Sequence, residues 1–380
     1  MILTPMESRT FSVILVVGIV ASLHTVLAAE DSLSPIRIAG DRQSFIHADT
    51  GEPYRPWGFN YLGRHGELAE ETWHSNWQRI ETDFREMRRL DANVVRWHLQ
   101  LATFMKSPTE ADDKQLARLR RLLDLARDND LYLDLTGLNC YRRDKVPAWY
   151  DALPEAERWQ VQACFWEAVA ATCAGHPAVF CYDLMKEPVI GPANEGDHPW
   201  LSGELGGLYF VQRISNDLAG RTNIEIAESW VQQQTAAIRR QDPDRLITVG
   251  VIPWAQIFPG AKPIFYAPGP ATHLDFVSVH FYPQTGKVPA ALTALARYDI
   301  GKPMVVEEIF PLACSIEELD EFIDGASDRV DGWMSHYFGH TPGEHRAGTE
   351  PGGPITAEFL DHWQAKGKGE ARRRLAPPSR

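Results

Sequence analysis

The chain has few of the features that would tie it to nucleic acid, a membrane or a structural metal. The chain contains 38 Lys and Arg and 51 Asp and Glu, which gives a net charge of −13. A polyanion is therefore a poor partner, and no nucleic acid is expected. No apolar run reaches the ~20 residues that span a bilayer comfortably, so no stable membrane partner is expected. The five cysteines are odd in number and lack metal-ligand spacing, which predicts no metal site. One disulfide would be compatible with this count.

The N-terminus has the features of a secretion signal. Arg9 precedes an apolar stretch from Phe11 to Leu23, and small residues around Ala28 suit a cleavage site. We expect residues 1–28 to be a signal peptide and the protein to be secreted or periplasmic, with an uncleaved anchor as the alternative. Residues 29–365 are expected to form one domain, and residues 366–380 a disordered basic tail.

Short apolar runs alternate with helix-period segments along the chain. Near-continuous apolar strands separated by helices are typical of a parallel sheet covered on both faces. No Gly-x-Gly-x-x-Gly follows the first run, which weighs against an open nucleotide-binding sheet. The pattern predicts an α/β fold, a closed (β/α)8 TIM barrel. Its eight strands are expected near residues 55–61, 93–97, 131–135, 179–185, 246–251, 276–280, 304–307 and 332–337.

Two glutamates end buried strand-like runs. Glu187 follows the fourth run and Glu308 ends the seventh; spacing from Pro303 favours Glu308 over its neighbour Glu307. A carboxylate at such a place is costly unless it has a partner or a task. Glycoside hydrolysis needs two carboxyl groups, one as proton donor and one as nucleophile or base. Arg96 and Tyr282 could hold Glu308 ionised, whereas Glu187 would need a partly desolvated setting that keeps it protonated.

Other polar and aromatic side chains also end or follow the predicted strands. In a barrel these positions converge on one pocket at the C-terminal face. The tryptophans among them offer flat apolar faces that suit sugar rings, although packing is an equal alternative for Trp333, and His280 could be a core histidine. A metal-dependent hydrolase using His280, His98 and the glutamates is a further alternative. The candidates for substrate binding are Arg96, His98, Asn139, Lys186, Trp254, His280, Tyr282 and Trp333.

Five segments resemble glycoside hydrolase family 5, a clan A family of cellulases and β-mannanases. They are Gly58–Tyr61, Asn93–Arg96, Tyr182–Pro188, His280–Pro283 and Lys302–Glu308, within about residues 55–340.

The resemblance implies a retaining hydrolase of a β-linked glucan, mannan or related glycoside, without metal or organic cofactor. Its partner would be an oligo- or polysaccharide. Glu187 would be the general acid/base and Glu308 the nucleophile. Arg96 would be the partner of the nucleophile, with His280 and Tyr282 lining the sugar site.

One position departs from the family pattern. Lys186 stands where the family has Asn, a residue that normally hydrogen-bonds the sugar 2-hydroxyl. Lys can donate but cannot accept, and its charge beside Glu187 would favour the carboxylate and weaken it as an acid. Two readings follow: an active glycosidase in which Lys186 turns toward Asp183 or another carboxylate, or a catalytically impaired carbohydrate-binding barrel.

Overall fold

The computed structural model describes residues 33–63, 67–192, 198–349 and 352–373, besides Met1. Apart from Met1, the predicted signal peptide, residues 1–28, lies outside them. Leu33–Arg380 group as one unit, and the fold below concerns that unit. In these described ranges, no helix combines the length and apolar character required to cross a membrane. The five cysteines, all in described positions, are free thiols.

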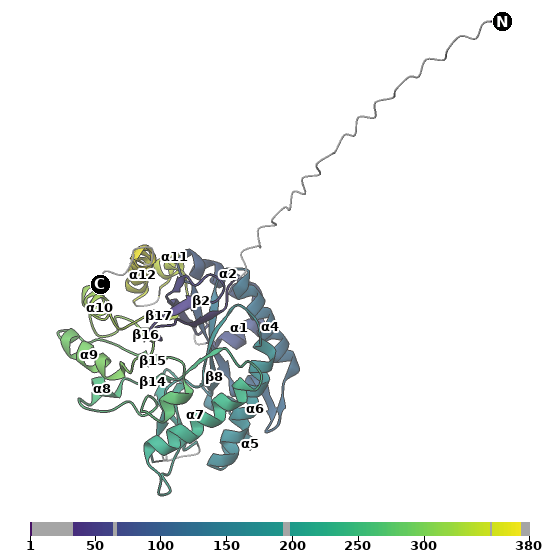
Figure 1. The fold of residues 1–380 in the computed structure, drawn as a ribbon. Helices are drawn as coiled ribbons and strands as arrows, with labels where there is room; N and C mark the ends of the chain where they lie inside the picture. The colour runs from purple at the N-terminus through teal and green to yellow at the C-terminus, as the bar shows by residue number, and fades with distance from the viewer. Residues whose placement is uncertain (2–32, 64–66, 193–197, 350–351, 374–380) are drawn as a thin grey trace. The chain divides into compact units, whose positions relative to one another are not determined.

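Parallel strands form a nearly closed barrel, as the sequence predicts (Figure 1). The sheet counts nine strands because the fifth position is interrupted at Val249, with its first piece paired to the fourth strand and its second to the sixth. The last strand pairs with the first. In ring order from the first, the strands are β4 (Trp57–Tyr61), β5 (Val94–Gln100), β8 (Tyr132–Asn139), β9 (Val179–Asp183), β13 (Leu246–Thr248), β14 (Gly250–Val251), β15 (Val277–His280), β16 (Met304–Ile309) and β17 (Gly332–Phe338).

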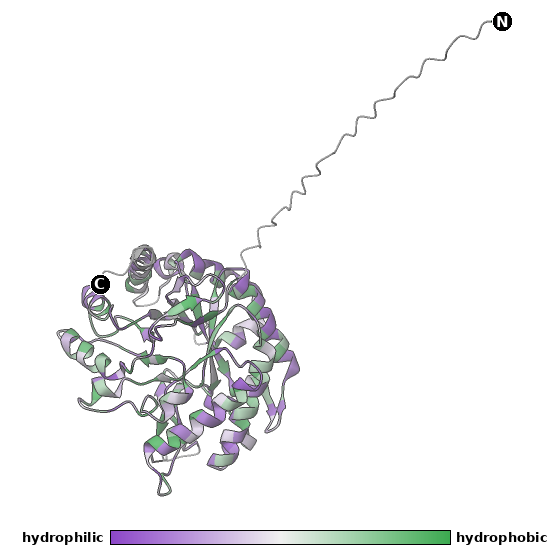
Figure 2. Cartoon of the chain, in the orientation of Figure 1, coloured by the Kyte–Doolittle hydropathy of each residue, from purple (hydrophilic) through white to green (hydrophobic). Residues whose placement is uncertain are grey.

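Helices surround the strands (Figure 1), and the strands are the more uniformly apolar elements (Figure 2). Helical spacing places Ile80, Phe84 and Met87 on one buried face of α2. A capping box formed by Ser315 and Glu318 begins α10. The larger helices are α2 (Trp77–Arg89), α4 (Asp113–Arg127), α6 (Glu155–Cys173), α7 (Asn223–Arg239), α9 (Val288–Leu295), α10 (Ile316–Gly325) and α12 (Gly353–Arg373).

A small antiparallel sheet that the sequence did not predict covers the N-terminal ends of the barrel strands. It consists of β1 (Ile36–Ile38), β2 (Phe45–His47) and β3 (Pro53–Tyr54). Phe45 packs edge-on against Phe180 and Phe276, with ring centroids 5.4 and 5.3 Å apart. The apolar face of this small sheet shields the N-terminal ends of the barrel strands from water. The C-terminal ends of the strands remain open for a site.

The connections carry the remaining short elements. The long segment after the fourth strand contains a three-stranded sheet in the order β10-β12-β11. These strands are β10 (Pro188–Ile190), β11 (Leu201–Leu205) and β12 (Leu208–Ser215). The others are α1 (Ala69–Ser75), α3 (Leu101–Phe104), β6 (Met105–Ser107), β7 (Glu110–Ala111), α5 (Ala148–Asp151), α8 (Trp254–Ile257), α11 (Pro342–Ala347) and 3-10 turns at Arg143–Lys145, Pro270–His273 and Ala296–Tyr298.

The predicted boundary of the basic tail was wrong. Helix α12 runs on to Arg373, because the residues after 365 still pack on the folded unit. Lys366 forms ion pairs with Asp320 and Asp324 at 3.0 and 3.1 Å. A Cβ at position 367 would lie 2.5 Å from Trp57 Nε1, so glycine permits the helix to approach this closely. Residues 374–380 lie outside the described part.

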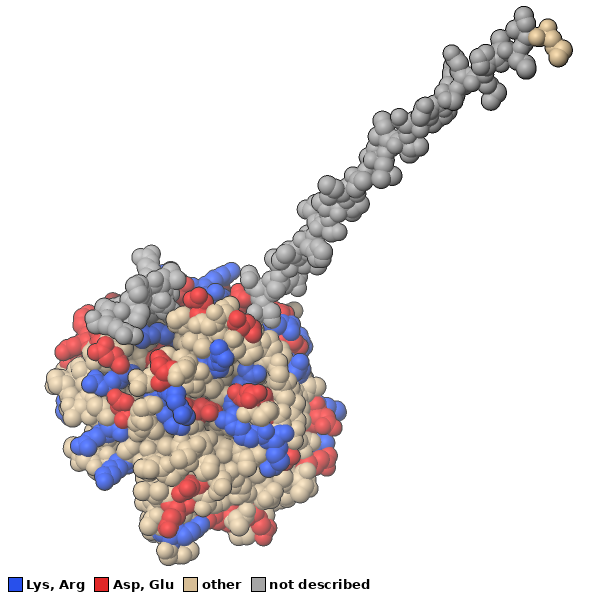
Figure 3. Space-filling model, viewed as in Figure 1, with Lys and Arg blue, Asp and Glu red and all other residues tan. Residues whose placement is uncertain are grey.

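Acidic and basic side chains are interspersed over the face shown in Figure 3. Such a mixed surface is compatible with a neutral substrate.

Candidate active site

Glu308 lies at the C-terminal end of β16 and receives hydrogen bonds on both oxygens. Its Oε1 accepts from Arg96 at 2.9 Å and from the Lys186 ammonium. Its Oε2 accepts from the Tyr282 hydroxyl at 2.8 Å. Burial alone would raise the pKa of Glu308, but His280, Lys186 and Arg96 outweigh it and hold the pKa well below its usual range. The side chain is therefore a buried, ionised carboxylate.

Arg96 is the fully buried cation beneath this carboxylate. Besides Glu308, its guanidinium donates to Asp183 Oδ2 at 2.6 Å and to Asn60 Oδ1 at 3.1 Å, while Nε donates to Thr136 at 2.7 Å. The fork geometry of arginine lets one side chain serve partners from four strands. Arg96 is thus a partner of Glu308, as predicted, and also joins the strand ends into one network.

Glu187 faces Glu308 from the end of the fourth strand. Its backbone has a φ of 51°, in the left-handed region that costs a non-glycine residue about 1–3 kcal/mol, and its N–H donates to the Gly250 carbonyl at 2.8 Å. An oxygen of Glu187 lies within 4.8 Å of an oxygen of Glu308, with His280 in the same group. The backbone strain therefore accompanies the placement of this carboxylate at the barrel mouth.

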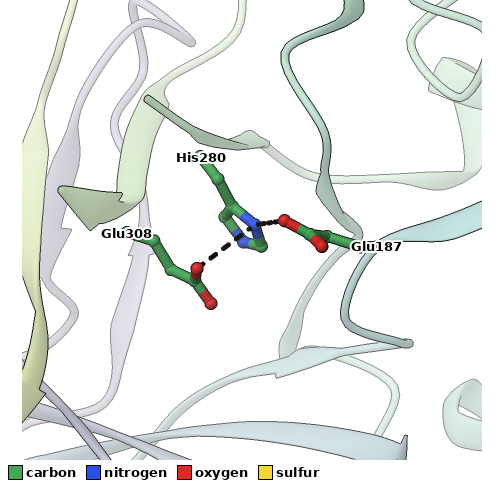
Figure 4. A group of neighbouring side chains, drawn as sticks. All are labelled: Glu187, His280 and Glu308. Carbon is green, nitrogen blue, oxygen red and sulfur yellow. Dashed lines mark hydrogen bonds and ion pairs between the residues drawn. The ribbon is translucent and has the colours of Figure 1, made fainter. Parts of the chain in front are cut away.

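His280 lies between the two carboxylates (Figure 4). Its Nδ1 is 2.7 Å from Glu187 Oε1 and 3.7 Å from Glu308 Oε2. Burial alone would lower the pKa of His280, but the carboxylates raise it above its ordinary value. An imidazolium in this position donates its Nδ1–H to Glu187.

The environment of Glu187 differs from the expectation that it be kept protonated. Burial raises the pKa of Glu187, but Lys186 and His280 outweigh this effect and lower the pKa below its usual value. Lys186 therefore favours the ionised form of Glu187, as its positive charge predicts. Its ammonium nevertheless binds Glu308 rather than Asp183, and it lies 5.2 Å from the centre of the Phe210 ring.

A pocket of about 580 Å³ opens above these groups. Lys186, Glu187, Tyr282 and Glu308 line it, and a second pocket that includes His280 adjoins at Glu187 and Tyr282. The structure therefore brings six of the predicted residues together: Arg96, Lys186, Glu187, His280, Tyr282 and Glu308. The neighbouring Glu307, by contrast, is fully buried and accepts a hydrogen bond from Ser278.

Four predicted residues lie elsewhere. Trp333 is buried with its ring 6.0 Å from that of Phe322 in α10, so it packs against the helical shell instead of facing a sugar. Trp254 stacks on Phe258 beside a separate apolar pocket. A shift of one residue along a strand reverses the direction of a side chain, which residue identity alone does not reveal.

Asn139 and His98 have structural contacts. Asn139 donates to the Leu99 and Thr136 carbonyls and borders another pocket. His98 contacts Asn60 Oδ1 through Nε2 at 3.1 Å and Tyr141 through Nδ1 at 2.7 Å. Because Asn60 Oδ1 can only accept, His98 carries its proton on Nε2. It therefore does not join His280 and the glutamates as a metal ligand.

Sequence reasoning missed two pocket residues. His336 of β17 has its Nδ1 3.8 Å from Glu308 Oε2 and lines the pocket, and burial lowers its pKa to about 4. Its place three residues after Trp333 on the last strand was the available signal. Phe210 of β12 lines the wall, but no local pattern links this insertion residue to the barrel mouth.

A divalent ion is not favoured between Glu187, His280 and Glu308, although their ligand atoms lie close enough to share one. The Lys186 ammonium already occupies Glu308, and a dication beside it would be repelled. The geometry instead suits chemistry carried by two carboxyl groups.

Paired carboxylates at the C-terminal mouth of a (β/α)8 barrel are the arrangement that glycoside hydrolysis requires. A family model described as cellulase, glycosyl hydrolase family 5, matches residues 52–303. That range exceeds half of the chain, and the chain therefore belongs to glycoside hydrolase family 5. Glu308 lies five residues beyond the matched range.

Solved structures share the fold at low sequence identity. An exo-β-1,4-mannosidase from Opitutaceae bacterium strain TAV5 has a TM-score of 0.64 and 17% identity; the match covers 90% of this chain but only 63% of that protein. An endoglucanase catalytic domain from Thermobifida fusca has a TM-score of 0.56 and 16% identity, over 88% and 97% of the two chains. A β-1,4-mannanase from the sea hare Aplysia kurodai has a TM-score of 0.57 and 16% identity, and the match covers 86% of this chain and 96% of that protein. No curated protein sequence matches.

Proposed function

We propose that the protein is an exported, retaining hydrolase of β-linked glycosides. The observation that carries this proposal is the approach of Glu187 and Glu308, whose oxygens lie within 4.8 Å. Retaining glycosidases hold their two carboxyl groups ~5–5.5 Å apart, whereas inverting enzymes leave ~6.5–9.5 Å for a water molecule.

In the proposed reaction, Glu308 attacks the anomeric carbon while Glu187 protonates the departing glycosidic oxygen. A covalent glycosyl-enzyme forms on Glu308. Glu187, now ionised, removes a proton from water, which attacks the same carbon and releases Glu308. Arg96 and Tyr282 stabilise the carboxylate that is regenerated, because their hydrogen bonds to Glu308 strengthen when it is charged.

Related structures supply the candidates for the substrate. They include a β-1,4-mannosidase, a β-1,4-mannanase and an endoglucanase, so β-mannosides and β-glucosides are the first oligo- or polysaccharides to assay. Export is proposed from residues 1–28 and is tested by sequencing the N-terminus of secreted material; an N-terminus at Met1 would contradict it.

The test is hydrolysis of a panel of aryl and oligomeric β-mannosides and β-glucosides. Glu308→Ala should abolish turnover, and Glu187→Ala should spare only substrates with good leaving groups, because these need no proton. The surface variant Glu110→Ala is the matched control. Proton NMR of the first-formed product should show retained anomeric configuration; inversion, or full activity of Glu308→Ala, would refute the mechanism.

A catalytically impaired, sugar-binding barrel is the second candidate, because the Lys186 ammonium occupies an oxygen of the proposed nucleophile. In that case calorimetry would detect oligosaccharide binding to the wild type without turnover. Lys186→Asn would free the oxygen and restore hydrolysis. If the wild type turns over substrate at ordinary glycosidase rates, this candidate is excluded.

A further inference from the structure

Exposed apolar side chains gather at the mouth of the pocket that holds Glu187 and Glu308. Among the described residues after Ser32, the three most exposed large apolar side chains are Leu312, Leu205 and Ile355, at 73, 72 and 67% exposure. Leu205 and Leu312 line this pocket, and Ile355 lies one residue from Thr356, which also lines it.

These three residues come from different parts of the chain. Leu205 ends β11, Leu312 follows β16, and Ile355 lies in the first turn of α12. Single exposed leucines are ordinary on a protein surface, but convergence at one opening marks a binding surface. Phe210 and Phe310 continue the apolar lining inward. We call Leu205 and Leu312, the two that line the pocket, the apolar collar.

The collar suits a different group from a sugar ring. Sugars stack their C–H faces on flat aromatic rings, whereas branched aliphatic side chains offer no such plane and contact alkyl chains well. We propose that the substrate is an amphipathic glycoside, with its sugar at Glu187 and Glu308 and an alkyl or acyl group against the collar. This rests on the proposed function, and the apolar group comes either from the aglycone or from an ester on the sugar.

The experiment measures kcat/KM for a series of alkyl β-glycosides from methyl to octyl, beside sugars bearing acyl esters of matched length. Each methylene that reaches the collar should raise kcat/KM by about fourfold. In the double variant Leu205→Ser/Leu312→Ser, the ratio of kcat/KM for the octyl glycoside to that for the methyl glycoside should fall to about one. Ile224→Ser, at an exposed site that begins α7, is the control and should keep the gain. If kcat/KM rises with chain length in the alkyl series, the apolar group belongs to the aglycone. If it rises in the ester series, the apolar group belongs to an ester on the sugar.

Two results would overturn the proposal: equal kcat/KM along both series, or a gain that survives the double substitution. Light scattering is the second measurement, because a dimer that the double variant dissociates would assign the collar to contacts between copies. If the wild type hydrolyses nothing, the proposed function fails separately. Calorimetry of octyl and methyl glycosides on Glu308→Gln then still tests the collar.

A second, independent observation concerns the layer beneath Glu308. Asp134, Asp183 and Glu307 are fully buried, and their oxygens converge within 4.8 Å. Arg96 is the cation that serves them: it binds Asp183 at 2.6 Å and lies 3.4 Å from Glu307 Oε2. Among the described residues, neither oxygen of Asp134 accepts a hydrogen bond from a nitrogen or oxygen donor, and neither does Glu307 Oε2; beside Asp134 lies the Cys181 thiol, a weak donor.

A carboxylate without donors in a dry interior is costly. One proton on Asp134 would turn two unpartnered acceptors into a donor and an acceptor. We infer that Asp134 keeps a proton, which it shares with Glu307, and so positions the strand that carries Glu308. The groups facing Asp134 are Arg96 on β5, Cys181 and Asp183 on β9, and Glu307 on β16.

Asp134→Asn supplies a permanent N–H and tests this inference. We expect it to keep wild-type kcat/KM at neutral pH and to extend the alkaline limit of activity. Asp134→Leu, which has no donor, should lose at least tenfold in kcat/KM. The infrared difference spectrum between the wild type and Asp134→Asn should contain the band of one protonated carboxyl group, because the band of Glu70, which is also protonated, cancels. A missing band, or an equal loss in both variants, would overturn the inference.

Discussion

Replacing Lys186 by Met should move the pH profile of hydrolysis to higher pH. The acid/base must be protonated when substrate binds, so kcat/KM falls as pH rises through the pKa of Glu187. Lys186 and His280 lower that pKa against the effect of burial. Removing one of these two cations while keeping the burial should therefore raise it.

The size of the shift follows from the contact. A charge within ~4–6 Å changes a carboxyl pKa by one to three units, and each unit is about 1.4 kcal/mol. We expect the alkaline limb of kcat/KM to move up by about 1–3 pH units in Lys186→Met. The pKa of Glu308 should also rise, but Arg96 and His280 still hold Glu308 ionised, so the acid limb should move less.

The assay is kcat/KM from pH 3 to 9 (roughly the interval that brackets carboxyl titration in proteins), with a β-linked oligosaccharide, whose departing sugar oxygen needs the proton of Glu187. Lys287→Met is the matched control, because Lys287 lines the neighbouring pocket beside Glu187 but is exposed, and solvent screens its charge. The reasoning is refuted if the alkaline limb in Lys186→Met stays within ~0.3 units of the wild type, or moves to lower pH.

Three further outcomes are expected. Tyr282→Phe removes the 2.8 Å hydrogen bond to Glu308, worth about 1.5–3 kcal/mol to a charged acceptor, so steady-state kcat should fall about 10–100-fold while the melting temperature holds; a loss under twofold contradicts this. Arg96→Met leaves Asp183 and Glu308 without their buried cation and should cost about 3–5 kcal/mol of unfolding free energy in urea, whereas an unchanged midpoint would contradict it. Burial raises the pKa of Glu70 to about 8. The folded state therefore keeps a proton that the unfolded chain releases, and stability should decline as pH rises from about 5 to 8; calorimetry should show a smaller decline in Glu70→Gln, and an unaltered slope would count against this reasoning.

The alternation of apolar runs and helical segments was sufficient to predict the barrel. Each strand could be predicted from its own residues alone, because a strand buried on both faces requires apolar residues at nearly every position. The strand ends then indicated where Glu187 and Glu308 would lie. The small sheet around Phe45 escaped prediction, since strands of two or three residues leave no periodic signal.

By itself, the sequence determined the fold class, the family resemblance and the identity of the two facing carboxylates. Only the tertiary structure decided that Lys186 would bind Glu308, that Trp333 would face the helices, and that Leu205 and Leu312 would line one opening. The physical reason is the same in each case. Side-chain direction and long-range charge pairing depend on register and on partners more than a hundred positions away in the chain, and no local pattern records them.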